Sequence, residues 1–335
     1  MEIHAWSPYN VLPIDLLRTR ISWTAHDLDK TINAQIDINR LKSIGDNESR
    51  ILTKALQEWD KREYRDDEII KWARGVLEEY YLIVKDGKES VRDNISEYKF
   101  NPEQIFELIK TRRSVRRWEQ KSVSNDLIKQ ILEAASWAPS ACNRQSCRYI
   151  VLQNEQQKQL LVNLREEWLK HAPVIIFVGS DKRNYLPVEY DYVPYMDAAV
   201  ATQNMLLMAH ALGLGATMVK CTGWDLLEGR SHNYSRKILN MYEGLNLPKH
   251  FIPVAIVALG YPLRFPKEPA RLSIESTVVF EKYGVEGIDD MTFTYSDLIE
   301  TGEAKSPDIN SIGTKELFKT VIKRVLKRTA RKIGL

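Results

Sequence analysis

Two short stretches of the sequence combine side chains that could hold a charged, flat ligand. The first reads TRRSVRRW and places Arg112, Arg113, Ser114 and Arg116 at the end of a predicted helix. An arginine fork binds phosphate through two hydrogen bonds, and a hydroxyl adds one more. Arginines at a helix C-terminus also complement the helix dipole. This stretch alone therefore leaves a phosphate site and a plain helix end both open.

The second stretch, residues 139–145, reads PSACNRQ and connects a predicted helix to a strand. The amides of Asn143 and Gln145 each offer a donor and an acceptor, which is what the edge of a pyrimidine-like ring requires. A turn rich in serine and asparagine is the alternative. Cys142 and Cys147 are too few to form a zinc site, and no histidine flanks them, so no metal is predicted.

The elements that must position these stretches lie in residues 101–285. Helical patterns alternate there with short apolar runs such as PVIIFVGS and FIPVAIVALGYP. Asn101 is the expected cap of the first helix, with Pro102 at its first position. Residues 194–215 read PYMDAAVATQNMLLMAHALGLG and predict a long buried helix that stops at glycines. By itself, this alternation favours a layered α/β domain with a parallel sheet.

The rest of the chain supplies two flanking parts. Residues 1–100 predict a helical extension, with Asn47 and either Asp66 or Asp67 as helix caps. Residues 286–335 predict a polar connector and a basic amphipathic helix. We find no chemical motif in the first hundred residues.

Charge is concentrated at the C-terminal end of the chain. The 335 residues carry a net charge of +3, but residues 315–335 hold eight Lys/Arg and one Glu. Such a helix is typical of contact with an anionic membrane, although it could equally pack on its own domain or on a dimer mate. Nucleic-acid binding is not predicted, because the segment has one aromatic residue, Phe318, and the body is net acidic.

The composition indicates in which cellular compartment the protein is expected. Three cysteines in a chain of this length favour a reducing environment over a disulfide framework. The N-terminus shows neither the basic nor the apolar region of a signal peptide, and no run of about 18 apolar residues is present. We expect a cytoplasmic protein, with peripheral contact at the inner face of the membrane if residues 315–335 meet lipid.

Taken in order, these motifs resemble the FMN-dependent nitroreductase family. RRSVRR, APSACNRQ, DAAVATQNMLLMAHALGLGA, PVAIVALGYP and a later arginine occur in the family's order, over about residues 105–285. The resemblance implies an α+β three-layer sandwich, in which helices wrap a central, mostly antiparallel sheet. It replaces the parallel sheet that alternation favours. It also implies a homodimer with FMN at the subunit interface.

The resemblance assigns roles to the residues of both stretches. Arg112 and Arg271 would hold the FMN phosphate, and Arg116 would lie near flavin N1 and O2. Arg113 and Ser114 would lie along the phosphate and ribityl chain. The remaining predicted cofactor-binding residues are those of the partner-facing loop, Pro139, Ser140, Ala141, Asn143 and Gln145, and those beside flavin N5, Met218, Val219 and Lys220. No side chain need act as a catalytic acid or base.

The implied function is hydride transfer from NAD(P)H or an organic donor, through flavin N5, to a small acceptor. The chain departs from the family pattern at Ser146-Cys147, where Pro-Trp is common, and at Met218 and Lys220 near N5. These departures and the basic tail keep an alternative open. It is a non-catalytic or specialised membrane-associated protein of the same fold, in an envelope-polysaccharide or similar assembly.

Overall fold

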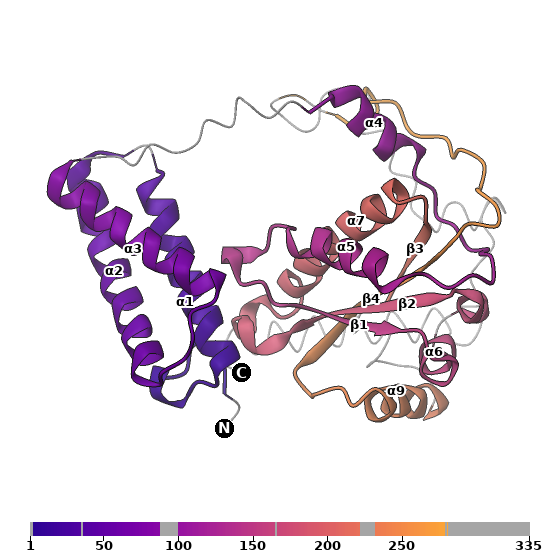
Figure 1. The fold of residues 1–335 in the computed structure, drawn as a ribbon, viewed down its shortest axis with the longest axis horizontal. Helices are drawn as coiled ribbons and strands as arrows, with labels where there is room; N and C mark the ends of the chain where they lie inside the picture. The colour runs from indigo at the N-terminus through magenta and orange to yellow at the C-terminus, as the bar shows by residue number, and fades with distance from the viewer. Residues whose placement is uncertain are drawn as a thin grey trace, which may run out of the picture. The chain divides into compact units, whose positions relative to one another are not determined.

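The structure is a computed structural model that describes residues 3–34, 36–87, 100–164, 166–221, 232–278 and 280 (Figure 1). Contacts divide the chain into two units, Met1–Glu268 and Pro269–Leu335. Every helix and strand given below belongs to the first unit. Among the described residues, no helix combines the length and apolar character needed to cross a membrane.

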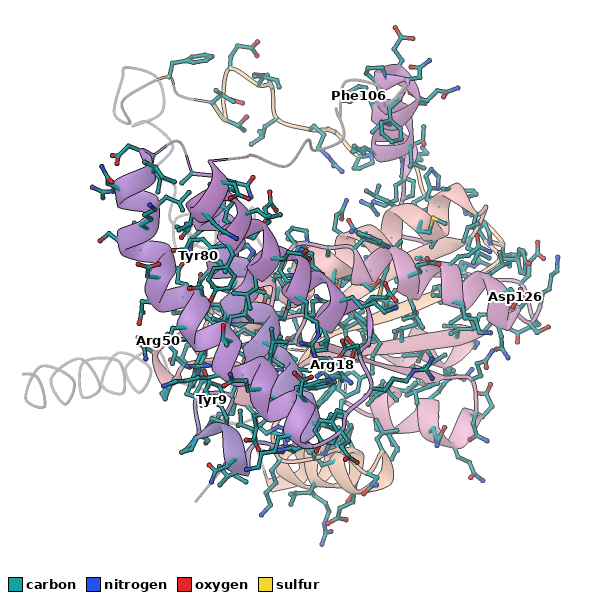
Figure 2. The ribbon with its side chains drawn as sticks, turned by 60° about the vertical axis from the view of Figure 1, so that its left-hand side comes forward. Tyr9, Arg18, Arg50, Tyr80, Phe106 and Asp126 are labelled. Atoms are coloured by element: carbon teal, nitrogen blue, oxygen red, sulfur yellow. The ribbon has the colours of Figure 1, made fainter. Side chains whose placement is uncertain are left out.

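Three helices form the N-terminal part: α1 (Ile14–Ile32), α2 (Ile38–Lys61) and α3 (Glu68–Asp86), preceded by the 3-10 turn η1 (Tyr9–Val11). They pack around a core that includes the fully buried Trp59 and Tyr80, and Figure 2 shows Tyr80 among these helices. Burial of such aromatic groups is the main stabilising contribution to a small helical layer.

The helix caps test the sequence-based boundaries. Asp67 caps α3 as predicted, because its Oδ1 accepts hydrogen bonds from the N–H groups of Ile69 and Ile70. The prediction of a helix start at Asn47 is wrong. Asp37 caps a single helix, α2, that runs through Asn47, and the Asn47 side chain instead accepts from Arg50 Nη2 at 2.7 Å. Continuous apolar periodicity across this region outweighs one polar residue that favours caps.

The second part of the first unit is built on a four-stranded sheet in the order β1-β2-β4-β3. Its strands are β1 (Cys147–Leu152), β2 (Val174–Asp181), β3 (Gly215–Lys220) and β4 (Phe251–Gly260). All three pairings are antiparallel. The α+β class is therefore confirmed, and the parallel sheet favoured by the alternating pattern is wrong.

Helices cover both faces of this sheet (Figure 1). One face packs on α5 (Asn125–Ser136) and α7 (Val193–Ala211), and the other on α6 (Glu155–Val162) and α9 (His232–Gly244). Alternate residues of β2 serve the two layers, with Ile176 in the first core and Phe177 in the second. This period of two is what a strand buried on both faces requires. The remaining elements are α4 (Pro102–Thr111) and the 3-10 turns η3 (Ala141–Asn143), η4 (Glu167–His171), η5 (Lys182–Asn184) and η6 (Pro187–Glu189).

The helix predicted at residues 194–215 is present as α7, but it is not buried on all sides. Met196 is 64 % exposed and Val200 is 41 % exposed, whereas Ala201 and Met205 lie in the core. The prediction of full burial is wrong for the single chain, because nothing in the described part of the chain covers this face of α7. The apolar pattern shows that a surface avoids water, and it does not show which chain covers that surface.

Candidate functional site

The arginine segment, residues 112–116, runs along the free edge of β3. Val115 N donates to Ala216 O at 3.1 Å, Ser114 forms a parallel bridge with Ala216, and Trp118 Nε1 donates to Gly215 O at 2.7 Å. A Cβ added to Gly215 would lie 2.7 Å from the Val115 side chain. The glycine therefore permits this close approach, which fixes the segment against the sheet.

Two guanidinium groups of this segment, those of Arg112 and Arg113, place positive charge near His210. Arg113 Nη1 donates to Lys110 O at 2.6 Å and to Arg112 O at 2.9 Å, and its Nη2 lies 3.4 Å from the Glu268 carboxylate. Burial, and then the charges of Arg112 and Arg113, lower the pKa of the neighbouring His210. Burial is the larger cause of this shift, and the two arginines add positive charge to the region; their contact with a phosphate stays a prediction.

The predicted N5 segment lies further along the same edge strand. On β3, Met218 and Lys220 are exposed and Val219 is half-buried. Because side chains alternate along a strand, the side chains of Met218 and Lys220 lie on the same face of the sheet as that of Ala216. Ala216 is also the residue to which the arginine segment is bonded. The structure thus brings the two groups of predicted residues, 112–116 and 218–220, to one edge of the sheet.

The other predicted group, the 139–145 loop, lies at the opposite edge. It leads directly into β1, and β2 and β4 separate β1 from β3. Three interstrand spacings amount to about 14 Å. A single chain therefore does not bring this loop together with the arginine segment.

Three residues of the loop region adopt a left-handed backbone without being glycine. These are Cys142, Asn143 and Gln145, with φ angles of 51°, 49° and 49°. Each such residue costs of order 1 kcal/mol and persists only where its surroundings hold it. Contacts within the loop and from outside it therefore hold this conformation.

A buried polar network supplies part of that support. Asp197 Oδ1 accepts from Ala141 N at 2.9 Å, and Asp197 Oδ2 accepts from the Tyr185 hydroxyl at 2.8 Å. The Tyr185 hydroxyl also bonds the hydroxyl of Ser146. Within the loop, Gln145 N donates to Ser140 Oγ at 3.0 Å. Sequence reasoning missed Asp197 and Tyr185, since only the fold brings them under the loop.

The N-terminal helices supply the rest. Ser22 Oγ on α1 donates to Asn143 O at 2.9 Å. Next to it, the Arg144 guanidinium lies 4.7 Å from the ring centroid of Trp23 and pairs with both carboxylate oxygens of Glu189, at 2.8 and 3.0 Å. The predicted motif contains Arg144, yet the sequence offered no signal for its partners on α1.

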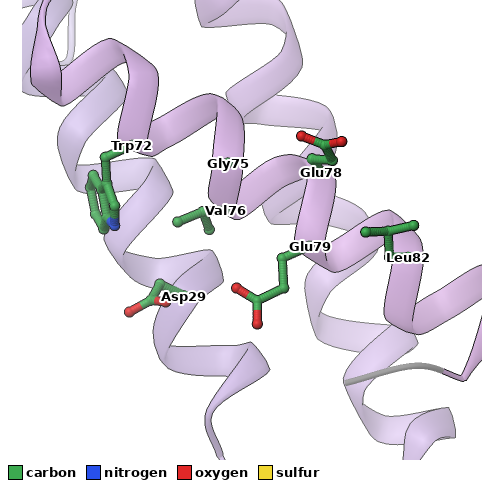
Figure 3. Close-up of a pocket in the computed structure, with 7 residues that line it drawn as sticks. All are labelled: Asp29, Trp72, Gly75, Val76, Glu78, Glu79 and Leu82. Carbon is green, nitrogen blue, oxygen red and sulfur yellow. The ribbon is translucent and has the colours of Figure 1, made fainter. Parts of the chain in front are cut away.

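Two further features concern the predicted site less directly. Arg271 is exposed in the second unit and donates from Nη1 to Ala270 O at 3.1 Å; its contact with the phosphate stays a prediction. A hollow of about 490 Å³ lies between α1 and α3 and is lined in part by Trp72, Asp29 and Glu79 (Figure 3). Its carboxylates would repel a phosphate, so it is not a candidate FMN site.

Comparison with known proteins points to one family. The model of the Nitroreductase family matches residues 109–164 and 156–261. A protein from Methanothermobacter thermautotrophicus, named as a candidate NADH dehydrogenase/NAD(P)H nitroreductase, is 33 % identical over 181 residues, which cover 51 % of this chain and 86 % of that protein. The FMN reductase [NAD(P)H] of Bacillus subtilis is 24 % identical over 197 residues, covering 54 % of this chain and 74 % of that protein.

Among solved structures, a candidate nitroreductase from Desulfovibrio desulfuricans in complex with FMN is 28 % identical, with a TM-score of 0.45, covering 55 % of this chain and 99 % of that one. The chain belongs to the nitroreductase family, a family of FMN-dependent oxidoreductases. The predicted family, fold class, enzyme class and cofactor are therefore confirmed at the level of the family.

Proposed function

We propose that this protein binds FMN along the edge of β3 and uses it for hydride transfer. The observation that carries the proposal is the arginine segment fixed against β3, beside residues 218–220 of the same strand. The chemistry supplied by bound FMN is the transfer of hydride from a reduced donor, NAD(P)H or an organic compound, to a small acceptor.

The chain's own residues bind and orient the cofactor and tune its charge. Arg112, with Arg271, would neutralise the phosphate, and Ser114 would donate a hydroxyl to the same region. Arg116 would place a fixed cation near N1 and O2, where the reduced ring carries negative charge. The exposed strand backbone at 218–220 would approach N5. No proton transfer by a side chain is needed.

We further propose a homodimer in which the 139–145 loop of one subunit lines the FMN held by the other. The separation of the two groups of residues within one chain supports this arrangement. So does the exposed apolar surface of α5 and α7, where Trp137 is 82 % exposed and Met196 is 64 % exposed. On α4, which has no buried residue, Phe106 is 65 % exposed (Figure 2). Contiguous apolar surface of this kind commonly marks a protein–protein contact.

The test is the visible spectrum of the purified protein, followed by anaerobic titration with NADH, NADPH and organic hydride donors. The proposal expects stoichiometric FMN with absorbance at about 450 nm, as a flavin gives, and bleaching by at least one donor. A protein that takes up no FMN when reconstituted would contradict the proposal. That outcome would favour the non-catalytic alternative.

A separate proposal concerns residues 315–335, which lie outside the described residues. Their eight Lys/Arg support reversible contact with an anionic membrane, at about 1 kcal/mol per basic residue near the surface. Co-sedimentation of the full chain and a 1–312 truncation with anionic vesicles tests it. Only the full chain should pellet, and salt should release it. An insoluble truncation, with no pelleting of the full chain, would mean that the segment packs against protein instead.

A further inference from the structure

The side chain of Arg144 is buried inside a group of aromatic residues from two parts of the chain. It is 2 % exposed, and its guanidinium lies 4.7 Å from the Trp23 ring, 5.7 Å from the Trp6 ring and 5.5 Å from the Tyr185 ring. Trp6 and Trp23 come from the N-terminal part. A guanidinium over aromatic faces is stabilised by the ring quadrupoles, and more strongly where water is excluded.

Glu189 on η6 completes the surroundings of Arg144. Its two carboxylate oxygens accept from the two terminal nitrogens of Arg144, and Glu189 Oε2 also accepts from Leu186 N at 2.7 Å. Burial alone would raise the pKa of Glu189, but the hydrogen bonds from Arg144 and from Leu186 N lower it. A two-pronged pair of this kind fixes orientation as well as charge. The Arg144 backbone is therefore held at one place relative to η6 and α1.

The residues directly around Arg144 are the strained ones. Asn143 precedes it and Gln145 follows it, and both have positive φ angles. The Asn143 carbonyl oxygen accepts the hydroxyl hydrogen of Ser22, which is 1 % exposed on α1. Two contacts thus connect the loop to the N-terminal helices: the hydrogen bond from Ser22 to Asn143 O and the packing of Arg144 on Trp23.

We propose that the N-terminal helices belong to the reaction machinery, because they hold the 139–145 loop in the conformation that lines the partner's FMN. Arg144 is the positioning residue, and Ser22 and Trp23 are its supports on α1. The inference rests on the proposed function, in which this loop faces flavin. It gives the N-terminal helices a role in the reaction, although they lie outside the nitroreductase-like part, which begins near residue 100.

The experiment compares Arg144→Lys and Ser22→Ala with wild type, all as full-length chains. Arg144→Lys keeps the positive charge but loses the paired hydrogen bonds to Glu189. Ser22→Ala removes the α1 hydroxyl that donates to Asn143 O. Thr24→Ala is the matched control, because the Thr24 hydroxyl donates within α1, to Arg20 O at 2.8 Å, and not to the loop. Two readouts are needed: iodoacetamide labelling of Cys142, mapped by mass spectrometry, and acceptor turnover per bound FMN.

Release of the loop should raise the labelling rate of Cys142, a half-buried thiol within it, by about fivefold or more in both variants. Turnover per bound FMN should fall about tenfold in Arg144→Lys and about threefold in Ser22→Ala, which correspond to about 1.4 and about 0.65 kcal/mol. FMN affinity should change by less than about threefold, because the arginine segment is intact. Thr24→Ala should match wild type in every readout.

Unchanged Cys142 labelling in both variants would overturn the inference, as would faster labelling with wild-type turnover per FMN. If Arg144→Lys does not fold, Ser22→Ala decides by the same two readouts. A failure of the proposed function looks different, since wild-type protein would then bind no FMN; that result would overturn both proposals. A merely structural role would lower the melting temperature without changing turnover per bound FMN.

Discussion

The arginine segment and the 139–145 loop are held in place in different ways. The arginine segment is fixed by backbone contacts to its neighbour β3, such as Val115 N to Ala216 O, while Arg116 and its neighbour Arg117 stay exposed. The loop is strained and is held by side chains from α7, η6 and α1. The first arrangement fixes the backbone and keeps the Arg116 side chain at the surface. The second uses its polar groups to fix a surface.

The difference implies that substitutions in the two regions should have different effects. A change in the arginine segment should alter how tightly FMN is bound and leave the fold intact. A change under the loop should alter stability and loop position before it alters affinity. The following predictions separate these two behaviours.

The largest expected effect is on FMN affinity. Arg112→Ala and Arg271→Ala should each weaken FMN binding about ten- to a hundredfold, because each removes a charge-assisted contact of roughly 1.5–3 kcal/mol. Titration of apo protein by flavin fluorescence quenching measures it. Arg117→Ala is the control, since Arg117 is exposed and outside the predicted site. Wild-type affinity in both variants would remove the proposed phosphate site.

The second effect is on stability in alkaline solution, and it concerns Cys147, the first residue of β1 after the 139–145 loop. Burial, with the nearby Asp197 charge, raises the pKa of Cys147 to about 11 from 9.0. The thiol ionises more easily in the unfolded chain. The free energy of unfolding should therefore be unaffected below pH about 9 and fall by roughly 2–3 kcal/mol as pH rises to about 11. Urea unfolding across this range should show a smaller fall for Cys147→Ala. Identical pH slopes for the two proteins would contradict the assignment.

The smallest effect concerns the helix that leads into Arg112. Asn101 Oδ1 caps α4 by accepting from Glu103 N at 2.9 Å and Gln104 N at 3.2 Å. Asn101→Ala should cost the helix about 1 kcal/mol, seen as faster amide exchange across residues 103–111, and should weaken FMN binding by less than about threefold. Gln104→Ala serves as the control. A loss of affinity as large as that of Arg112→Ala would mean that α4 itself contacts FMN.

These two regions also differ in how far the sequence predicts them. The arginine segment follows from residue types and order along the chain, and the caps Asn101 and Asp67 follow from local hydrogen bonding. The antiparallel pairing came from family resemblance, because alternation of helices and strands does not distinguish strand direction. The contacts that hold the loop were not predictable. Ser22 and Asn143 are 121 positions apart, and no local sequence pattern at either residue predicts their hydrogen bond.

The same limit applies to α7. Its predominantly apolar sequence predicts a buried helix, but Met196 and Val200 are exposed in one chain. Hydrophobic patterning reports burial in the assembled protein and does not distinguish burial within a chain from burial between chains. The exposed face therefore supports the proposed second subunit.

The central claim, a flavin site shared by two subunits, is tested most directly by a mixed dimer. Arg112→Ala chains would lack the phosphate anchor, and Asn143→Gly chains would lack the loop amide while keeping the left-handed backbone that glycine tolerates. Each variant alone should turn over poorly. After co-refolding at equal amounts, half of the dimers would be mixed with one intact site each, so activity should return to about one quarter of wild type by random pairing. No recovery, or a monomer at micromolar concentration that retains FMN and full activity, would contradict the account and would place the N-terminal helices where the partner is proposed.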